Sequence, residues 1–125
     1  MSIATVHANA FYEQAVRDGS VFTVLEDDSF LIFPVRDKED KEVVPFWSSQ
    51  SRVEKMQATH PKYAQYAISK IPLAEFLEKT LAQFEEENIN VGVNWSGKRL
   101  VGYDVSVADL RRNIAYRLGK IGGRG

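Results

Sequence analysis

The sequence contains no cysteine, and this absence excludes several kinds of chemistry. Without a thiol the chain can form no disulfide, no thiolate nucleophile, no iron–sulfur cluster and no cysteine-ligated zinc site. Small secreted domains often depend on disulfides, so their absence favours a reducing compartment. From the sequence we therefore expect a cytoplasmic protein.

Histidine is scarce as well, because the chain has only His7 and His60. A zinc site needs three or four protein ligands at matched spacing, and no His-Glu-x-x-His pair or similar motif occurs. The glycines near the C-terminus do not form a Gly-x-Gly-x-x-Gly phosphate loop, and a P-loop is missing too. We therefore expect no metal and no organic cofactor, with both histidines exposed or paired within the fold.

Charge of neither sign is in excess, since 16 basic residues stand against 17 acidic ones and the net charge is −1. Proteins that bind duplex DNA usually carry a basic surplus, so the composition does not favour nucleic acid as a partner. No apolar run is long enough to cross a bilayer. The N-terminal residues lack the basic and apolar segments of a signal peptide, so we expect neither membrane association nor export.

Hydrophobic periodicity divides the first part of the chain into a helix, a hairpin and a strand. Apolar residues recur at helical spacing over 8–18, and Gly19 is placed to end that helix. Two runs rich in β-branched and aromatic residues flank an Asp-Asp-Ser turn and predict a hairpin over 20–35. Residues 36–42 alternate in charge and predict a solvated loop, after which 43–47 predict a short strand.

The middle of the chain gives weaker signals. Ser51 and Glu54 match a capping box, which predicts that a short helix begins there. Residues 62–71 fit both the helical and the strand period, and a short strand is favoured near their end. The stretch 72–87 has a single apolar stripe and predicts a helix with proline in its first turn.

The last part of the chain predicts a second hairpin and a final helix. Strict alternation over 89–95 indicates a strand with one buried face, and a Ser-Gly-Lys turn completes a hairpin over 89–105. A helix over 106–118 follows, and 119–125 are expected to form a flexible tail. The inner faces of the last two helices are expected to be Leu73, Phe76, Leu77, Leu81 and Phe84, then Val107, Leu110, Ile114 and Leu118.

These elements predict the fold class. Their order along 1–125 is helix, hairpin, strand, helix, possible strand, helix, hairpin and helix. This order predicts a single α+β domain, with a mostly antiparallel sheet built from two hairpins plus short strands and about four packed helices.

No motif of a catalytic nucleophile is visible. The stretch Asn94–Gly97 lacks the Gly-x-Ser-x-Gly frame of a nucleophile elbow and is best interpreted as a hairpin turn. A Ser–His–acid arrangement stays open, because such residues meet only in the fold. The glutamates at 85–87 are interpreted as a solvated helix end. The final helix carries a basic excess that could touch nucleic acid, although a solvated face is favoured.

The candidate partner-binding residues are Trp47, Asn94 and Trp95. Each tryptophan immediately precedes a change in chain direction, so both are expected at the margin of the sheet. Indole rings are common at binding hot spots, and the Asn94 amide lies nearby on the opposite face of its strand. The alternative is that both tryptophans belong to the core. Whether they share one margin depends on the strand order, which the sequence does not reveal.

The pattern of packing and turn residues resembles a bacterial family of unknown function, domain-of-unknown-function family 2750. The resemblance rests on Phe11-Tyr-Glu, Gly19, Val21-Phe22, Phe33-Pro34 and Pro45-Phe-Trp47, and on Ile71-Pro-Leu-Ala-Glu-Phe-Leu with Asn88-Ile-Asn-Val-Gly-Val-Asn-Trp95. It implies a cytoplasmic bacterial protein without an established activity, and it assigns no site residues. In fold order alone, the second half is also similar to the SseB N-terminal domain.

Three functions are compatible with the sequence. A non-catalytic protein-interaction or regulatory module is favoured, because no catalytic constellation is visible and several aromatic residues look exposed. Its partner would be a protein, and a second copy of the chain is one option. The alternatives are a small hydrolase or transferase with a site built from scattered Asp, Glu, Ser and His, and a nucleic-acid binder that uses the basic final helix.

Overall fold

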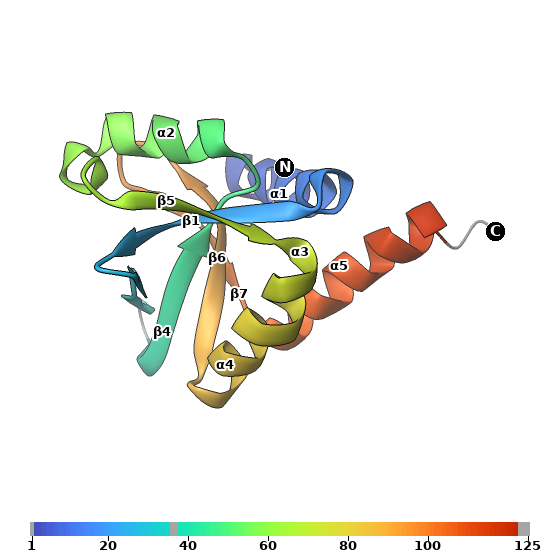
Figure 1. Cartoon of the computed structure of the whole chain (residues 1–125). Coiled ribbons are helices and arrows are strands. Elements are labelled where there is room, and N and C mark those ends of the chain that lie inside the picture. The colour runs from blue at the N-terminus through green and yellow to red at the C-terminus, as the bar shows by residue number, and fades with distance from the viewer. Residues whose placement is uncertain (1, 36–37, 123–125) are drawn as a thin grey trace.

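The computed structural model describes residues 2–35 and 38–122, which form two β-sheets with helices packed against them (Figure 1). The three-stranded sheet has the order β2-β1-β5 and the four-stranded sheet has the order β3-β4-β6-β7. The strands are β1 (Ser20–Glu26), β2 (Ser29–Phe30), β3 (Phe33–Val35), β4 (Lys38–Phe46), β5 (Ala67–Pro72), β6 (Ile89–Ser96) and β7 (Val101–Val105). The helices are α1 (Ile3–Asp18), α2 (Gln50–Thr59), α3 (Leu73–Glu75), α4 (Leu81–Glu86) and α5 (Val107–Gly122), with the short segments η1 (Pro61–Tyr63) and η2 (Phe76–Thr80).

The predicted α+β class and the mostly antiparallel pairing are confirmed. Strand pairs β1–β2, β1–β5, β3–β4 and β6–β7 are antiparallel, and β4–β6 is parallel. The strands form two sheets instead of one, joined by an antiparallel bridge between Phe22 and Trp47. The hairpin predicted over 89–105 is present as β6–β7.

The hairpin predicted over 20–35 is wrong beyond its turn. Asp27 and Asp28 have φ values of 51° and 65°, as a tight hairpin turn requires. However, β1 pairs with β2 only over two residues, and the chain then crosses to the other sheet as β3. Pro34 has no N–H to donate to a longer ladder with β1. Strand β5 pairs with the opposite edge of β1, from Ser20 to Leu25.

The solvated loop predicted over 36–42 is also wrong where the structure describes it. Residues 36–37 lie outside the described residues, but 38–42 belong to β4. Within this segment Lys38 pairs with Val35 and Glu42 pairs with Pro34 of β3, and Glu42 also pairs with Ile89 of β6. Backbone pairing with two neighbouring strands therefore overrides the charged side-chain pattern, because ladder hydrogen bonds do not depend on side-chain charge.

Helix α1 begins earlier and α2 begins differently from the predictions. The Ser2 hydroxyl accepts a hydrogen bond from the Thr5 N–H at 3.1 Å, so α1 begins at Ile3 and not at residue 8. Gly19 ends it with a φ of 74°, as predicted. Helix α2 is capped by Ser49 and not by Ser51, because the Ser49 hydroxyl accepts from the Arg52 N–H.

The final helix is longer than predicted, because α5 continues through Gly119 to Gly122. The predicted tail is therefore wrong over 119–122, and 123–125 lie outside the described residues. Glycine ends a helix when it adopts a positive φ, and Gly119 does not. The Ser106 hydroxyl caps the helix by accepting from the Asp109 N–H, but Leu118 is 44% exposed and does not belong to the predicted inner face.

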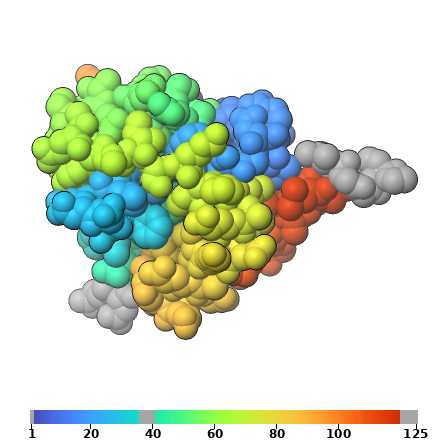
Figure 2. Space-filling view, in the orientation of Figure 1, coloured from blue at the N-terminus to red at the C-terminus, as the bar shows by residue number. Residues whose placement is uncertain are grey.

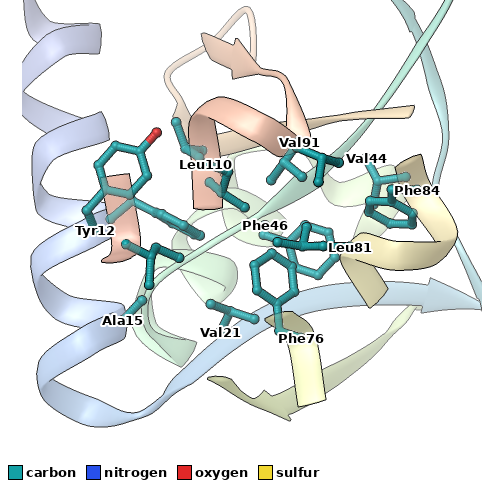
Figure 3. Packing of buried hydrophobic residues seen from close by; sticks show 14 of the residues in the cluster. Tyr12, Ala15, Val21, Val44, Phe46, Phe76, Leu81, Phe84, Val91 and Leu110 are labelled. Carbon is teal, nitrogen blue, oxygen red and sulfur yellow. The ribbon is translucent and has the colours of Figure 1, made fainter. Parts of the chain in front are cut away.

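The helix predicted over 72–87 contains a π-helical turn. Pro72 ends β5 and precedes α3, and η2 then separates α3 from α4. The wider turn places Phe76 and Leu81, which are five positions apart, on the same buried face with Phe84 (Figure 3). In the space-filling view the surface of α5 lies to the right of the surface that α3 and α4 form (Figure 2).

Two clusters of buried apolar side chains hold the sheets and helices together. The larger one packs α1, α3, η2, α4 and α5 on one face of the four-stranded sheet, around Phe46, Phe76 and Val91 (Figure 3). The smaller one lies beneath α2 and includes Phe22 and Trp47. Strand β6 is buried from Ile89 to Asn94, so the prediction of a single buried face for this strand is wrong.

Candidate functional site

A groove of about 600 Å³ opens on the four-stranded sheet between β3 and the β6–β7 hairpin. Val43 lines the groove while its neighbour Val44 belongs to the larger core cluster, so the groove lies on the opposite face of the sheet. Its floor and walls are mostly apolar and come from Phe33, Pro34, Val35, Val43, Trp95, Leu100, Val101 and Gly102. Arg99 and Asp104 are the charged residues that line it.

The Trp95 indole lies directly against the sheet, on two glycines. A Cβ atom built on Gly92 would lie 2.5 Å from Cε2 of the indole, and one built on Gly102 would lie 2.7 Å from Cδ1. The indole N–H donates to the Tyr103 carbonyl at 3.1 Å, and the Phe33 ring meets the indole edge to face at 5.7 Å. The ring is therefore fixed in position and borders the groove.

Replacing Gly92 by alanine is expected to displace the indole, because the added Cβ would lie 2.5 Å from an indole carbon. We expect a loss of about 1–3 kcal/mol in the free energy of unfolding, as for other overpacked sites. Urea denaturation and tryptophan fluorescence would measure both effects. Gly119→Ala is the matched control: a Cβ there meets no atom within 4 Å, and alanine favours the helix. Equal stability of Gly92→Ala and wild type would contradict the packing described.

The two charged residues of the groove lie at different points along its β7 side. Arg99 belongs to the turn before β7, whereas Asp104 lies near the end of the strand. Asp104 accepts a long hydrogen bond of 3.5 Å from the Asn90 amide. Neither is in an ion pair with another described residue. The groove thus offers a cation at one end, a carboxylate at the other and apolar surface between them.

Trp47 and Trp95 lie together at one margin of the sheet, a point that depended on strand order. Strands β4 and β6 are parallel neighbours, with Phe46 beside Val93. Their C-terminal ends therefore lie at the same end of the sheet. The Trp47 indole N–H donates to the Trp95 carbonyl at 2.8 Å. Trp47 is 1% exposed and belongs to the smaller core cluster, whereas Trp95 is half-buried at the groove.

Asn94 is buried and joins three segments of the chain. Its Oδ1 accepts from the Ser48 N–H at 2.9 Å, and its Nδ2 donates to the His7 carbonyl of α1 at 3.0 Å. The side chain therefore reaches toward α1, away from the groove. Its φ of 50° coincides with an irregularity in the β6–β7 pairing. Asn94 determines how β6 turns at Trp95, but its side chain is not accessible to a partner.

The structure brings one serine and one histidine together. His7 Nδ1 lies 3.0 Å from the Ser96 hydroxyl. Burial, and then the nearby Arg52 and Lys55 charges, lower the pKa of His7. No described carboxylate is hydrogen-bonded to His7, so the pair lacks the acid that would orient and stabilise an imidazolium. This pair therefore does not form a catalytic triad among the described residues.

The other candidate features have structural roles. His60 is hydrogen-bonded to the Gly97 carbonyl at 2.9 Å, and the described residues contain no group of three potential metal ligands. On α5, Arg112 pairs with Asp109, and the Arg117 guanidinium lies 5.0 Å from the centre of the Tyr12 ring. These basic side chains are thus partly engaged within the protein.

The sequence analysis proposed Trp95 as a candidate binding residue but did not predict the groove beside it. Gly92 and Gly102 were the available signal, since a glycine inside a strand often marks a close approach by another group. The positions of Phe33, Arg99 and Asp104 could not be related to Trp95, because β3 and β7 come together only through the strand order.

Comparison with known proteins identifies the family. Among the described residues, no helix has the length and apolar character that a membrane span requires. No curated protein and no solved structure matches the chain significantly, so the similarity to the SseB N-terminal domain stays a prediction. The family described as "Protein of unknown function (DUF2750)" matches residues 8–114, which is most of the chain. The resemblance seen in the sequence is confirmed, and the protein belongs to this family.

Proposed function

We propose that this protein is a non-catalytic interaction module of the bacterial cytoplasm, which binds an extended segment of a partner protein in the groove beside Trp95. The observation that carries the proposal is the position of the Trp95 indole at the border of an open groove. The ring lies flat on the sheet because Gly92 and Gly102 have no side chains that would displace it. A large aromatic ring held in place loses little entropy on binding, which is why such rings are common hot spots.

The lining of the groove favours a protein segment as its occupant. Its surface combines a largely apolar centre with charged side chains at the rim, as in protein–protein interfaces. The Tyr103 carbonyl already accepts the indole N–H, so Trp95 offers ring surface and no free donor. A proline or aromatic ring of the partner is therefore the expected anchor on Trp95.

The two charged residues of the groove favour one arrangement of charged side chains in the partner segment. Arg99 would attract an acidic side chain at one end of the bound segment, and Asp104 would attract a basic one at the other end. Such charge pairs fix the direction in which an extended segment binds and add modestly to its affinity. Trp47 and Asn94 would act as positioning residues, because both hold the end of β6 from inside the protein.

A random-peptide library displayed on phage, selected on the purified protein, tests this proposal. We expect the selected peptides to contain a ring flanked by an acidic residue. Trp95→Ala should lower the affinity for a synthetic copy of a selected peptide at least tenfold, which is about 1.4 kcal/mol of binding free energy, as measured by calorimetry. Arg99→Glu should weaken it too, and a peptide with its acidic residue changed to lysine should recover affinity for that variant. Ile32→Ala, an exposed position outside the groove, should bind normally.

Two results would contradict the proposal. One is that the selected peptides bind Trp95→Ala and Arg99→Glu as tightly as the wild type. The other is turnover of p-nitrophenyl acetate that Ser96→Ala abolishes, because this would make the His7–Ser96 pair a catalytic site.

A further inference from the structure

We propose that a second copy of this chain adds to the free edge of β7, so that the two four-stranded sheets become one continuous sheet across a two-fold axis. This interface does not depend on the proposed occupant of the groove, although Val101, Gly102 and Asp104 of β7 also line the groove. It rests on the contrast between β7 and the other sheet edges, on the direction of the β7 backbone groups and on the position of α1.

Three of the four sheet edges among the described strands carry features that discourage strand addition. Strand β2 has two residues, β3 has three residues and contains Pro34, and β5 contains Lys70 and Pro72. Short length, proline and lysine all protect edges against pairing with another chain. Strand β7 spans five residues and contains none of these residues.

The side chains of β7 are also unusually apolar for an edge. Val101 is 54% exposed and Tyr103 is 44% exposed. The Tyr103 carbonyl accepts from the Trp95 indole of β6, so it is directed toward β6. Because backbone groups alternate in direction along a strand, the N–H and C=O groups of Gly102 and Asp104 point away from the sheet, where a second strand can bind them.

An antiparallel copy centred on Tyr103 gives a compatible set of pairs. Tyr103 would face its own copy, Val101 would face Val105 of the other copy, and Gly102 would face Asp104. Like charges directly opposite each other destabilise a sheet, and this register places no Asp104 against another. The central pair would be of the type without backbone hydrogen bonds, in which the side chains lie closest.

The position of α1 provides an independent argument. Helix α1 packs over both β6 and β7, and Thr5 is hydrogen-bonded to the Tyr103 hydroxyl. With strands about 4.8 Å apart, the two copies of α1 would lie about 10 Å apart across the axis. This is within the usual distance for packed helices. Ile3 and Val6, which are exposed on α1, would gain an apolar partner there.

Size-exclusion chromatography with light scattering tests the proposal on the full chain. We expect the wild type to show twice the 14.2 kDa mass of one chain. Tyr103→Lys and Tyr103→Glu should each be monomeric, because like charges would face each other across the axis. An equal mixture of the two variants should restore the dimer, because lysine then faces glutamate.

Further variants distinguish strand addition at β7 from association through a different surface of the protein. Asp104→Pro removes an outward N–H and should be monomeric while keeping the circular dichroism of the wild type. Ile32→Lys, which charges an exposed apolar position elsewhere, and Trp95→Ala should both remain dimeric. A monomeric wild type at its highest attainable concentration would overturn the proposal. A dimer that survives both Tyr103 variants, or a mixture that stays monomeric, would overturn it as well.

Discussion

Replacing Trp47 by alanine is expected to lower the free energy of unfolding by about 3–5 kcal/mol, as for other large side chains removed from a core. The indole is 1% exposed and packs with Phe22, Val53 and Met56 beneath α2. Its removal would leave a cavity at the bridge where the two sheets meet, since the Trp47 and Phe22 backbones exchange hydrogen bonds there. The Trp95 carbonyl would also lose its indole donor.

Urea denaturation followed by circular dichroism would measure this loss. Trp47→Phe keeps most of the apolar volume and should cost clearly less than alanine. Trp95→Ala is the matched comparison, because its ring is half-buried and should contribute less to stability than that of Trp47. If Trp47→Ala proved as stable as Trp95→Ala, the assignment of Trp47 to the core would be wrong.

Replacing Asn94 by alanine should cost about 2–4 kcal/mol, the second largest effect we expect. The Ser48 N–H and the His7 carbonyl would each lose a partner inside the protein, at about 1–3 kcal/mol for a buried unsatisfied group. Alanine would also have to adopt the φ of 50°, which costs about 1–2 kcal/mol in an L-residue. These costs overlap, because the backbone can relax where a partner is lost.

Two variants separate the contributions to the Asn94 effect. Asn94→Gly accepts the positive φ but still loses both hydrogen bonds, so it should be more stable than Asn94→Ala and less stable than the wild type. Asn94→Asp keeps the acceptor for the Ser48 N–H but loses the amide donor to His7. Chemical denaturation of all three would test the order, and equal stability of the alanine and glycine variants would show that the backbone conformation contributes nothing.

The proposed binding surface depends on this buried support. Trp95 stands between Asn94 and Ser96, and hydrogen bonds to the core or to α1 hold each of its neighbours. The partner-binding role predicted for Trp47, Asn94 and Trp95 remains a proposal. The structure divides it between an accessible ring and two interior residues that position it.

Local patterns predicted most element types correctly but not how long each element is. The alternation of apolar residues in β6 and the apolar stripe of α4 were visible in the sequence. Both arise because the burial of one side of an element makes apolar residues recur at a regular spacing. The charged segment at the start of β4 was misinterpreted as a loop. It is a strand because of its backbone pairing, and that pairing does not require a particular pattern of side chains. Likewise, Gly119 was taken as a helix end although glycine is only permissive there.

By itself the sequence determined the α+β class and the absence of thiol chemistry, and its resemblance to a known family indicated the family. The fold class and the absence of thiols follow from composition and from periods that lie within single elements. Only the tertiary structure decided that β1 pairs with β5, that β4 and β6 run parallel and that Gly92 and Gly102 support one indole ring. Pairing between distant strands depends on how all buried surfaces pack together. A local sequence pattern contains no information about that packing. For the same reason the groove became visible only once β3 and β7 had their places in the sheet.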